Sequence, residues 1–146
     1  MKCRLIAAGT RMPAWVDAGF RDYQQRLRRP LSLELLEIPV ATVSKEGAAM
    51  LAAIAPEDYV VALVIAAKSL GTAELATWLA ARLQAGRPLA LLIGGPDGLA
   101  PACVARADLQ WSLSPLTLPH ALVRVIVAEQ LYRAVSLLAG HPYHRA

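Results

Sequence analysis

The stretch YVVALVI, residues 59–65, decides the fold class of this chain. It is a continuous apolar run of strand length, and residues 89–93 form a second such run, LALLI. Strands without polar residues are typical of parallel sheets, because helices on both faces keep either side away from water. The two runs therefore predict central strands of a buried parallel sheet.

Strand-like and helix-like patterns alternate on either side of these runs. Three further apolar segments predict strands at residues 2–9, 31–38 and 110–113. Helical spacing predicts helices at about residues 13–29, 44–55, 72–86 and 119–139, and a short one through Ala102 and Val104. Ser44 and Thr72 are the expected N-caps of the second and third helices. Such alternation is typical of an α/β fold with a mostly parallel sheet and helices on both faces.

The composition predicts a single folded domain over residues 1–146. A hydrophobic fraction of 56% and a charged fraction of 18% exclude a disordered chain. The longest apolar run is far shorter than the roughly 20 residues that cross a bilayer, and the first residues lack the apolar core of a signal peptide. The two cysteines form no CxxC pair, which fits a reducing compartment. We therefore expect a soluble cytoplasmic protein that contacts no membrane.

The glycine-rich loop GGPDG, residues 94–98, is the first candidate for a binding site. It follows a predicted strand directly, and ligands of open α/β sheets bind beyond the carboxyl ends of the strands. Glycine also lets a backbone approach a ligand closely. The loop matches neither the GxGxxG nor the phosphate-loop pattern, and a tight turn explains its glycines equally well.

Residues 111–133, WSLSPLTLPHALVRVIVAEQLYR, form the second candidate. A short strand leads into a proline-containing polar loop, whose backbone groups and leucines could hold a nucleoside-like cofactor. An ordinary strand-to-helix connection is the alternative. The helix that follows is apolar except for Arg124, and a buried arginine needs an acceptor. Asp97, a substrate phosphate and a developing oxyanion all remain open as its partner.

The tail, residues 141–146, is the third candidate. Tyr143, His144 and Arg145 combine a phenol, an imidazole and a guanidinium, which can stack on a base, contact phosphate and assist proton removal. A disordered tail is the alternative. We expect no metal site, because nothing near the His141-x-x-His144 pair completes a set of ligands.

Three stretches together resemble a known family. They are MKCRLIAAGTRMPAWVDAGFRDY (residues 1–23), LLIGGPDGLAPAC (91–103) and WSLSPLTLPHALVRVIVAEQLYRA with the later HPYHR (111–134 and 141–145). The chain is similar to the SPOUT, or trefoil-knot, methyltransferases, and among them to small members that modify the large ribosomal subunit. The resemblance implies an α/β domain with a deep C-terminal trefoil knot, a rare exception to unknotted topology.

The resemblance also implies a cofactor, a partner and residues for each role. S-adenosyl-L-methionine would lie in the knot, in contact with Leu63, Gly94, Gly95, Leu113, Ser114, Pro115, Leu116, Thr117 and Leu118. The family acts as a homodimer in which the knotted regions form the interface. One subunit's tail would reach toward the cofactor site of the other.

The implied substrate is a pseudouridine of 23S rRNA in the assembled ribosome, in the large-subunit stem-loop that faces the decoding centre. Its N3 carries a proton that must leave before methylation, so a base or a cation near the anion would accelerate transfer. We expect His144 to handle the proton, with Arg145, Tyr143 and Arg124 holding RNA or balancing charge. A non-catalytic ribosome- or RNA-binding factor and a SPOUT enzyme with another rRNA or tRNA target are the alternatives.

Two departures from the family pattern concern the loops. Ala66-Ala67-Lys68 stands where many members have Gly-Lys, so this loop is expected to be stiffer. Residues 40–46 are short where other members have a basic insertion, which predicts fewer RNA contacts from that region.

Overall fold

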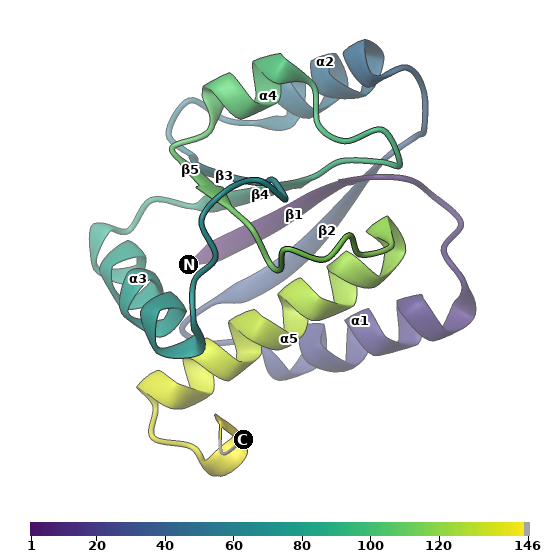
Figure 1. Ribbon diagram of the computed structural model, residues 1–146. Coiled ribbons are helices and arrows are strands. Elements are labelled where there is room, and N and C mark those ends of the chain that lie inside the picture. Colours follow the sequence, from purple (N-terminus) through teal and green to yellow (C-terminus); the bar gives the residue numbers. More distant parts are fainter. Residues whose placement is uncertain (145–146) are drawn as a thin grey trace.

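A computed structural model, which describes residues 1–144, contains one five-stranded sheet whose strands are all parallel (Figure 1). The strand order is β2-β1-β4-β3-β5. The strands are β1 (Lys2–Ala8), β2 (Ser32–Ile38), β3 (Tyr59–Leu63), β4 (Leu89–Ile93) and β5 (Leu109–Trp111). The predicted parallel sheet is thereby confirmed.

Helices cover both faces of the sheet, as predicted. They are α1 (Ala14–Arg26), α2 (Val43–Ala53), α3 (Thr72–Ala85), α4 (Pro101–Arg106) and α5 (His120–Leu138), followed by the short 3₁₀ helix η1 (Pro142–His144). Figure 1 shows α2 and α4 above the sheet and α1, α3 and α5 below it. Within residues 1–144, none of these helices is both long and apolar enough to span a membrane.

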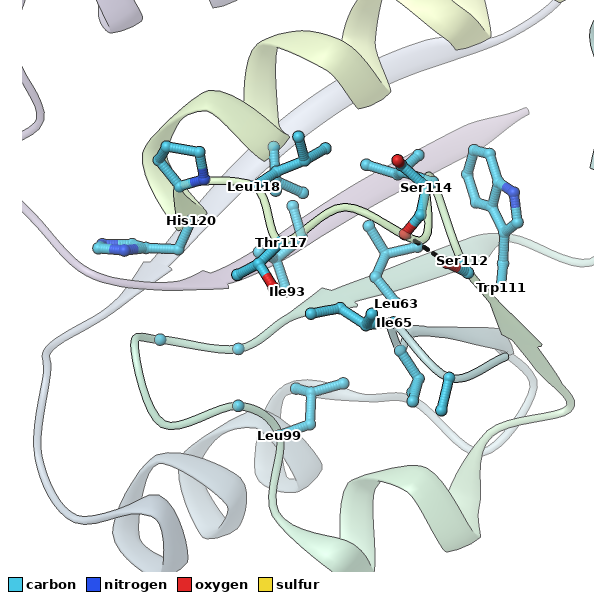
Figure 2. A pocket seen from close by; sticks show the side chains of 18 of the residues that line it. Leu63, Ile65, Ile93, Leu99, Trp111, Ser112, Ser114, Thr117, Leu118 and His120 are labelled. Atoms are coloured by element: carbon cyan, nitrogen blue, oxygen red, sulfur yellow. Dashed lines mark hydrogen bonds between the residues drawn. The ribbon is translucent and has the colours of Figure 1, made fainter. Parts of the chain in front are cut away.

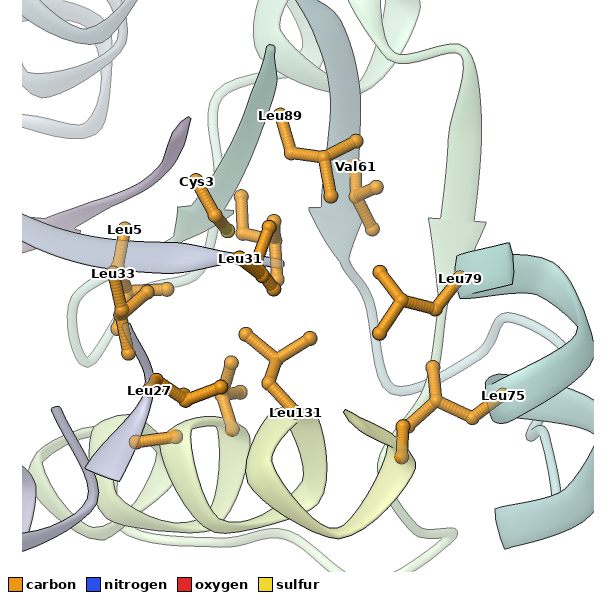
Figure 3. Packing of buried hydrophobic residues seen from close by; sticks show 14 of the residues in the cluster. Cys3, Leu5, Leu27, Leu31, Leu33, Val61, Leu75, Leu79, Leu89 and Leu131 are labelled. Carbon is orange, nitrogen blue, oxygen red and sulfur yellow. The ribbon is translucent and has the colours of Figure 1, made fainter. Parts of the chain in front are cut away.

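The larger core lies between the sheet and the helices α1, α3 and α5. All five residues of β4 are buried, because this central strand is covered on both faces. Leu131 of α5 and Leu79 of α3 pack against the strands and are fully buried (Figure 3). Burying a side chain of this size stabilises the fold by about 2 kcal/mol, so this face supplies much of the folding energy.

The smaller core lies between the sheet and the helices α2 and α4. Met50 of α2 and Cys103 of α4 pack there against Ile6 of β1. Gly47 lets the two helices approach closely, because a Cβ atom on it would overlap the Cβ of Ala100.

Cys3 lies on the other face of the sheet, where it is buried and forms no disulfide. Its burial raises the pKa of its thiol to about 12.

Several predicted boundaries were wrong by a few residues. The strand at 59–65 ends at Leu63, and the strand expected at 110–113 is Leu109–Trp111. Ser44 is not an N-cap; Thr42 is, and its hydroxyl accepts from the Lys45 N–H at 3.2 Å because its backbone is extended. Thr72 is the first residue of α3 rather than its cap. Gly71 occupies the cap position there, and its N–H donates to Glu74.

Residues 64–71, after β3, lie alongside the end of β5 (Figure 1). The Val64 N–H donates to the Trp111 carbonyl at 2.9 Å, and the Ser112 N–H donates to the Lys68 carbonyl at 3.0 Å. Both ends of this segment are therefore tied to the point where the chain leaves the sheet for α5. These contacts fit the threading that a trefoil knot requires, and the knot itself stays a prediction.

Gly47→Ala should destabilise the protein although alanine favours helices. The gain in helix propensity is about 1 kcal/mol. The new methyl group would overlap Ala100, and overpacking of a core costs about 1–3 kcal/mol, so we expect a net loss of about 1 kcal/mol. Urea unfolding measures the difference.

Gly19→Ala in α1 is the matched control. A Cβ atom there would lie 3.4 Å from the nearest atom of Val125, an ordinary contact. This variant should gain up to about 1 kcal/mol. Equal changes in the two variants would contradict the packing argument.

Candidate functional site

A cavity of about 670 Å³ opens at the carboxyl ends of β3 and β4 (Figure 2). Three segments form most of its wall: the end of β3 with the residues after it, the glycine-rich loop after β4, and the loop from β5 to α5. Ligand pockets commonly measure roughly 300–1,000 Å³, so a cofactor-sized molecule fits. The cavity lies where open parallel sheets bind their ligands.

The wall is mainly apolar, with backbone groups exposed between the side chains. Leu63, Ile65 and Leu99 face the same space in Figure 2. Among the lining residues that the structure describes, His120 alone has a titratable side chain. A ligand here would be held through apolar contacts and backbone hydrogen bonds more than through charge.

Two serines shape the loop between β5 and α5. The Ser112 hydroxyl donates to the Ser114 carbonyl at 3.0 Å, and the Leu116 N–H donates to the Ser114 hydroxyl at 2.9 Å (Figure 2). Side chains that bond to nearby backbone in this way stabilise a turn without regular secondary structure. The loop therefore presents a defined wall to the cavity.

The glycine-rich loop is both a tight turn and a wall of the cavity. A Cβ atom on Gly94 would lie 2.5 Å from the carbonyl carbon of Gly98 and 2.7 Å from the Leu99 nitrogen. Only glycine fits there, because backbone atoms cannot move aside as a flexible side chain can. Gly98 has a φ of 84°, which also favours glycine. The loop is therefore a tight turn, and it also lies where a ligand could bind.

The structure brings almost all of the predicted cofactor residues together. Eight of the nine line the cavity: Leu63, Gly94, Gly95, Leu113, Ser114, Leu116, Thr117 and Leu118. Pro115 belongs to the same loop but is not part of the wall. Sequence reasoning missed Ile65, which was assigned to a strand, and Leu99, which directly follows the glycine-rich loop. Ala66 and His120 lie within stretches that the sequence had singled out, but neither was named as a contact of the cofactor.

Arg124 is buried and lies outside the cavity wall. Its side chain is 1% exposed; Nη1 is 2.6 Å from Glu37 Oε2, and Nη2 donates to the Gly9 carbonyl at 2.6 Å. Asp97, one of the three partners that the sequence left open, is therefore not the group that pairs with Arg124. Arg124 lies one turn into α5, which places it against the ends of β1 and β2. In this chain its guanidinium ties α5 to those two strand ends.

The described start of the tail, residues 141–143, lies on the far side of α5 from the cavity. Tyr143 packs on α5, where its hydroxyl is 3.1 Å from Glu129 Oε1. Glu129 follows His120 by nine residues, about two and a half turns or 13 Å, so the two point to opposite faces of the helix. Tyr143 therefore does not reach the cavity of its own chain. The side chain of His144, and Arg145 entirely, lie outside the described residues.

Comparison with known proteins identifies the family of this chain. Residues 1–144 match the family model described as predicted SPOUT methyltransferase. The ribosomal RNA large subunit methyltransferase H of Alkalilimnicola ehrlichii is 54% identical over 156 positions that cover all of both chains. That of Thioalkalivibrio sulfidiphilus is 56% identical, covering 99% of each chain. This chain, with 146 residues, lacks some of the aligned positions. That the missing residues fall at 40–46 stays a prediction.

A solved structure shares the fold. It is the crystal structure of a methylase family protein from Neisseria gonorrhoeae, with a TM-score of 0.54 at 14% identity, covering 89% of this chain and 81% of that one. An α/β domain with a parallel sheet and a cavity at its carboxyl edge is the arrangement with which such proteins bind their ligands. The chain belongs to the SPOUT methyltransferase family. It is a methyltransferase and uses a methyl donor.

Removing Glu37 should destabilise the fold more than removing Arg124. Glu37→Ala leaves a guanidinium that is 1% exposed without its anion, which costs about 3–5 kcal/mol. Arg124→Met leaves a carboxylate that is 35% exposed and can take up water. Its cost, mainly lost hydrogen bonds, should be about 1–3 kcal/mol. Urea unfolding of both variants and of the double variant checks this order.

The same variants decide what Arg124 does. The double variant should be more stable than Glu37→Ala alone, because it removes the unpaired charge. If Arg124→Met lowers the free energy of unfolding more than Glu37→Ala does, the ion pair is not what holds α5 against the ends of β1 and β2. If it stays folded yet loses methyl transfer, Arg124 contacts the substrate.

Proposed function

We propose that this protein transfers a methyl group from S-adenosyl-L-methionine to N3 of a pseudouridine in 23S rRNA of the assembled ribosome. The observation that supports this most is the cavity at the carboxyl edge of the sheet, formed by the segments expected to hold the cofactor. The names of the relatives, ribosomal RNA large subunit methyltransferase H, support an rRNA of the large subunit as the substrate.

The cavity suits S-adenosyl-L-methionine in size and in chemistry. Residues 113–118 would hold it from one side and Leu63 with the glycine-rich loop from the other. Apolar side chains can contact a base and ribose, and free backbone groups can read the edge of an adenine. When bound, the cofactor supplies an electrophilic methyl group on a sulfonium centre. The cation suits a wall whose described residues include no arginine or lysine.

Among the described residues, one chain offers few groups that could take up the proton of the nucleotide. N3 of pseudouridine must lose a proton, and His120 is the sole titratable side chain among the described lining residues. The tail groups expected to help, Tyr143, His144 and Arg145, follow a helix whose far end is about 27 Å from His120. We therefore propose that the tail acts on the site of a second subunit in a homodimer.

The mild net charge of +4 supports recognition of a shaped ribosomal surface. Tight binding of bare RNA by charge alone needs many phosphate contacts, each with a cation. The stem-loop of the large subunit that faces the decoding centre offers such a surface. We therefore expect whole ribosomes to be better substrates than free 23S rRNA.

Titration with S-adenosyl-L-methionine tests the cofactor. The protein should bind it, and Gly94→Ala should weaken binding by at least about tenfold, because a Cβ there displaces the wall of the cavity. Gly19→Ala, in α1 and outside the cavity wall, is the control, because a new Cβ there would make only an ordinary contact at 3.4 Å. A protein that binds ribosomes but not the cofactor would be a non-catalytic ribosome-binding factor instead.

Methyl incorporation tests the substrate and the tail. Ribosomes should be labelled at one pseudouridine of 23S rRNA, and label elsewhere would indicate another RNA target. A chain ending at Gly140 should keep cofactor affinity within about twofold and lose methylation by at least about a hundredfold, since proton handling commonly contributes that much. Full activity of the shortened chain would exclude a role for the tail.

A further inference from the structure

Gly140 turns the chain back onto α5. Its φ of 71° is left-handed, the Gly140 N–H donates to the Leu137 carbonyl at 3.1 Å, and the His141 N–H donates to the Ser136 carbonyl at 2.9 Å. This pair of bonds is the Schellman arrangement, which ends helices at a glycine. Because of the reversal, η1 lies against the last turns of α5 and does not continue into solvent.

Tyr143 is held there by contacts on every part of its side chain. Its ring packs edge-on against Tyr132 with centroids 4.6 Å apart, and the Arg133 guanidinium lies 5.1 Å from its centroid. Its hydroxyl is 3.1 Å from Glu129 Oε1 and 3.3 Å from the hydroxyl of Tyr23 on α1. The hydroxyl of Tyr143 therefore lies within hydrogen-bonding distance of side chains on two helices, which is not expected of a residue without a defined position.

Glu129 is the centre of these contacts. Its Oε1 accepts from Arg133 Nε and Nη2 at 2.9 and 2.6 Å as well as from Tyr143, while its Oε2 accepts from Gln130 at 2.6 Å. The side chain is 16% exposed, so its bonds are only partly weakened by water. Burial raises the pKa of Tyr143, and the bond to Tyr23 and the charge of Glu129 raise it further, so the hydroxyl stays protonated and able to donate.

The hydroxyl of Tyr143 is thus already engaged, which changes the role expected for this residue. It was expected to hold RNA or balance charge at the reacting base. A phenol that donates to a carboxylate on its own α5 fixes the start of the tail. Tyr143, to which the rest of the tail is joined, therefore has a defined position on the helix.

We propose that Glu129 and Tyr23 are positioning residues, which hold the tail through Tyr143 so that the residues after it reach the methylation site of the second subunit. This inference rests on the proposed function, in which the tail acts in trans. The two residues touch neither cofactor nor base and act through the tail alone. A site that depends on a group supplied by another subunit needs that group held in place, because a misplacement of about 1 Å can cost a hundredfold in rate.

Three variants release the tail in different ways. Tyr143→Phe keeps the ring and removes the hydroxyl, Tyr23→Phe removes one neighbour, and Glu129→Ala removes the acceptor. Glu34→Gln is the control, since Glu34 pairs with Lys2 at 3.5 Å on the outermost strand β2, where both side chains are more than half exposed.

Ribosome methylation should show kcat lower by about tenfold or more for Tyr143→Phe and Glu129→Ala, and lower to a smaller extent for Tyr23→Phe. The dissociation constant for S-adenosyl-L-methionine should stay within about twofold in all of them, because none lines the cavity. Glu129→Gln keeps an acceptor oxygen and should recover part of the rate. Wild-type kcat in Tyr143→Phe, or an equal loss in Glu34→Gln, would overturn the proposal.

Limited cleavage by chymotrypsin after residue 143 gives a readout that needs no methyl transfer. Cleavage should be several-fold faster in Glu129→Ala and Tyr23→Phe than in the wild type and in Glu34→Gln, at unchanged urea midpoints. Unchanged cleavage would overturn the anchoring even if the enzyme is a methyltransferase. If the variants are cleaved faster but the wild-type protein does not methylate ribosomes, the anchoring holds and the proposed function is what failed.

Discussion

The burial of β1, β4 and β3 on both faces is the constraint on which the rest of this structure depends. Parallel neighbours cannot be joined by a hairpin, so each connection must cross the sheet, and here each crossing is a helix. Helices are consequently placed on both faces, and all carboxyl ends of the strands meet at one edge. The position of the cavity follows from that arrangement before any particular side chain is considered.

At this edge the wall of the cavity is formed by backbone and apolar groups more than by charged side chains. The wall is built from a glycine turn that no other residue can form at Gly94, a serine-shaped loop, and the segment after β3 that is bonded to Trp111 and Ser112. A site of this kind suits a ligand with a base, a ribose and an apolar stem. It also explains why the cavity offers few titratable groups for the proton of N3.

Helix α5 connects the parts of the molecule that the chemistry needs. Near its start, Arg124 bonds to Glu37 and Gly9, which fixes the helix against the ends of β1 and β2 beside the cavity. In its middle, Glu129 accepts a hydrogen bond from Tyr143 on the opposite face. Helix α5 thus contributes to the cavity wall at its start and holds Tyr143 further along, and this separation is the reason for proposing a two-subunit site.

The sequence by itself determined the fold class and the order of the elements, because these depend on local patterns: apolar runs for buried strands, helical spacing, and glycines where the backbone turns sharply. The residues expected to hold the cofactor came from the resemblance to the SPOUT family, and eight of them line the cavity. Only the tertiary structure decided that Arg124 pairs with Glu37, 87 residues away, and not with Asp97, and that Tyr143 meets Tyr23, 120 residues away. Such pairs depend on how the elements pack, and no local pattern encodes which distant side chain packing will bring within hydrogen-bonding distance.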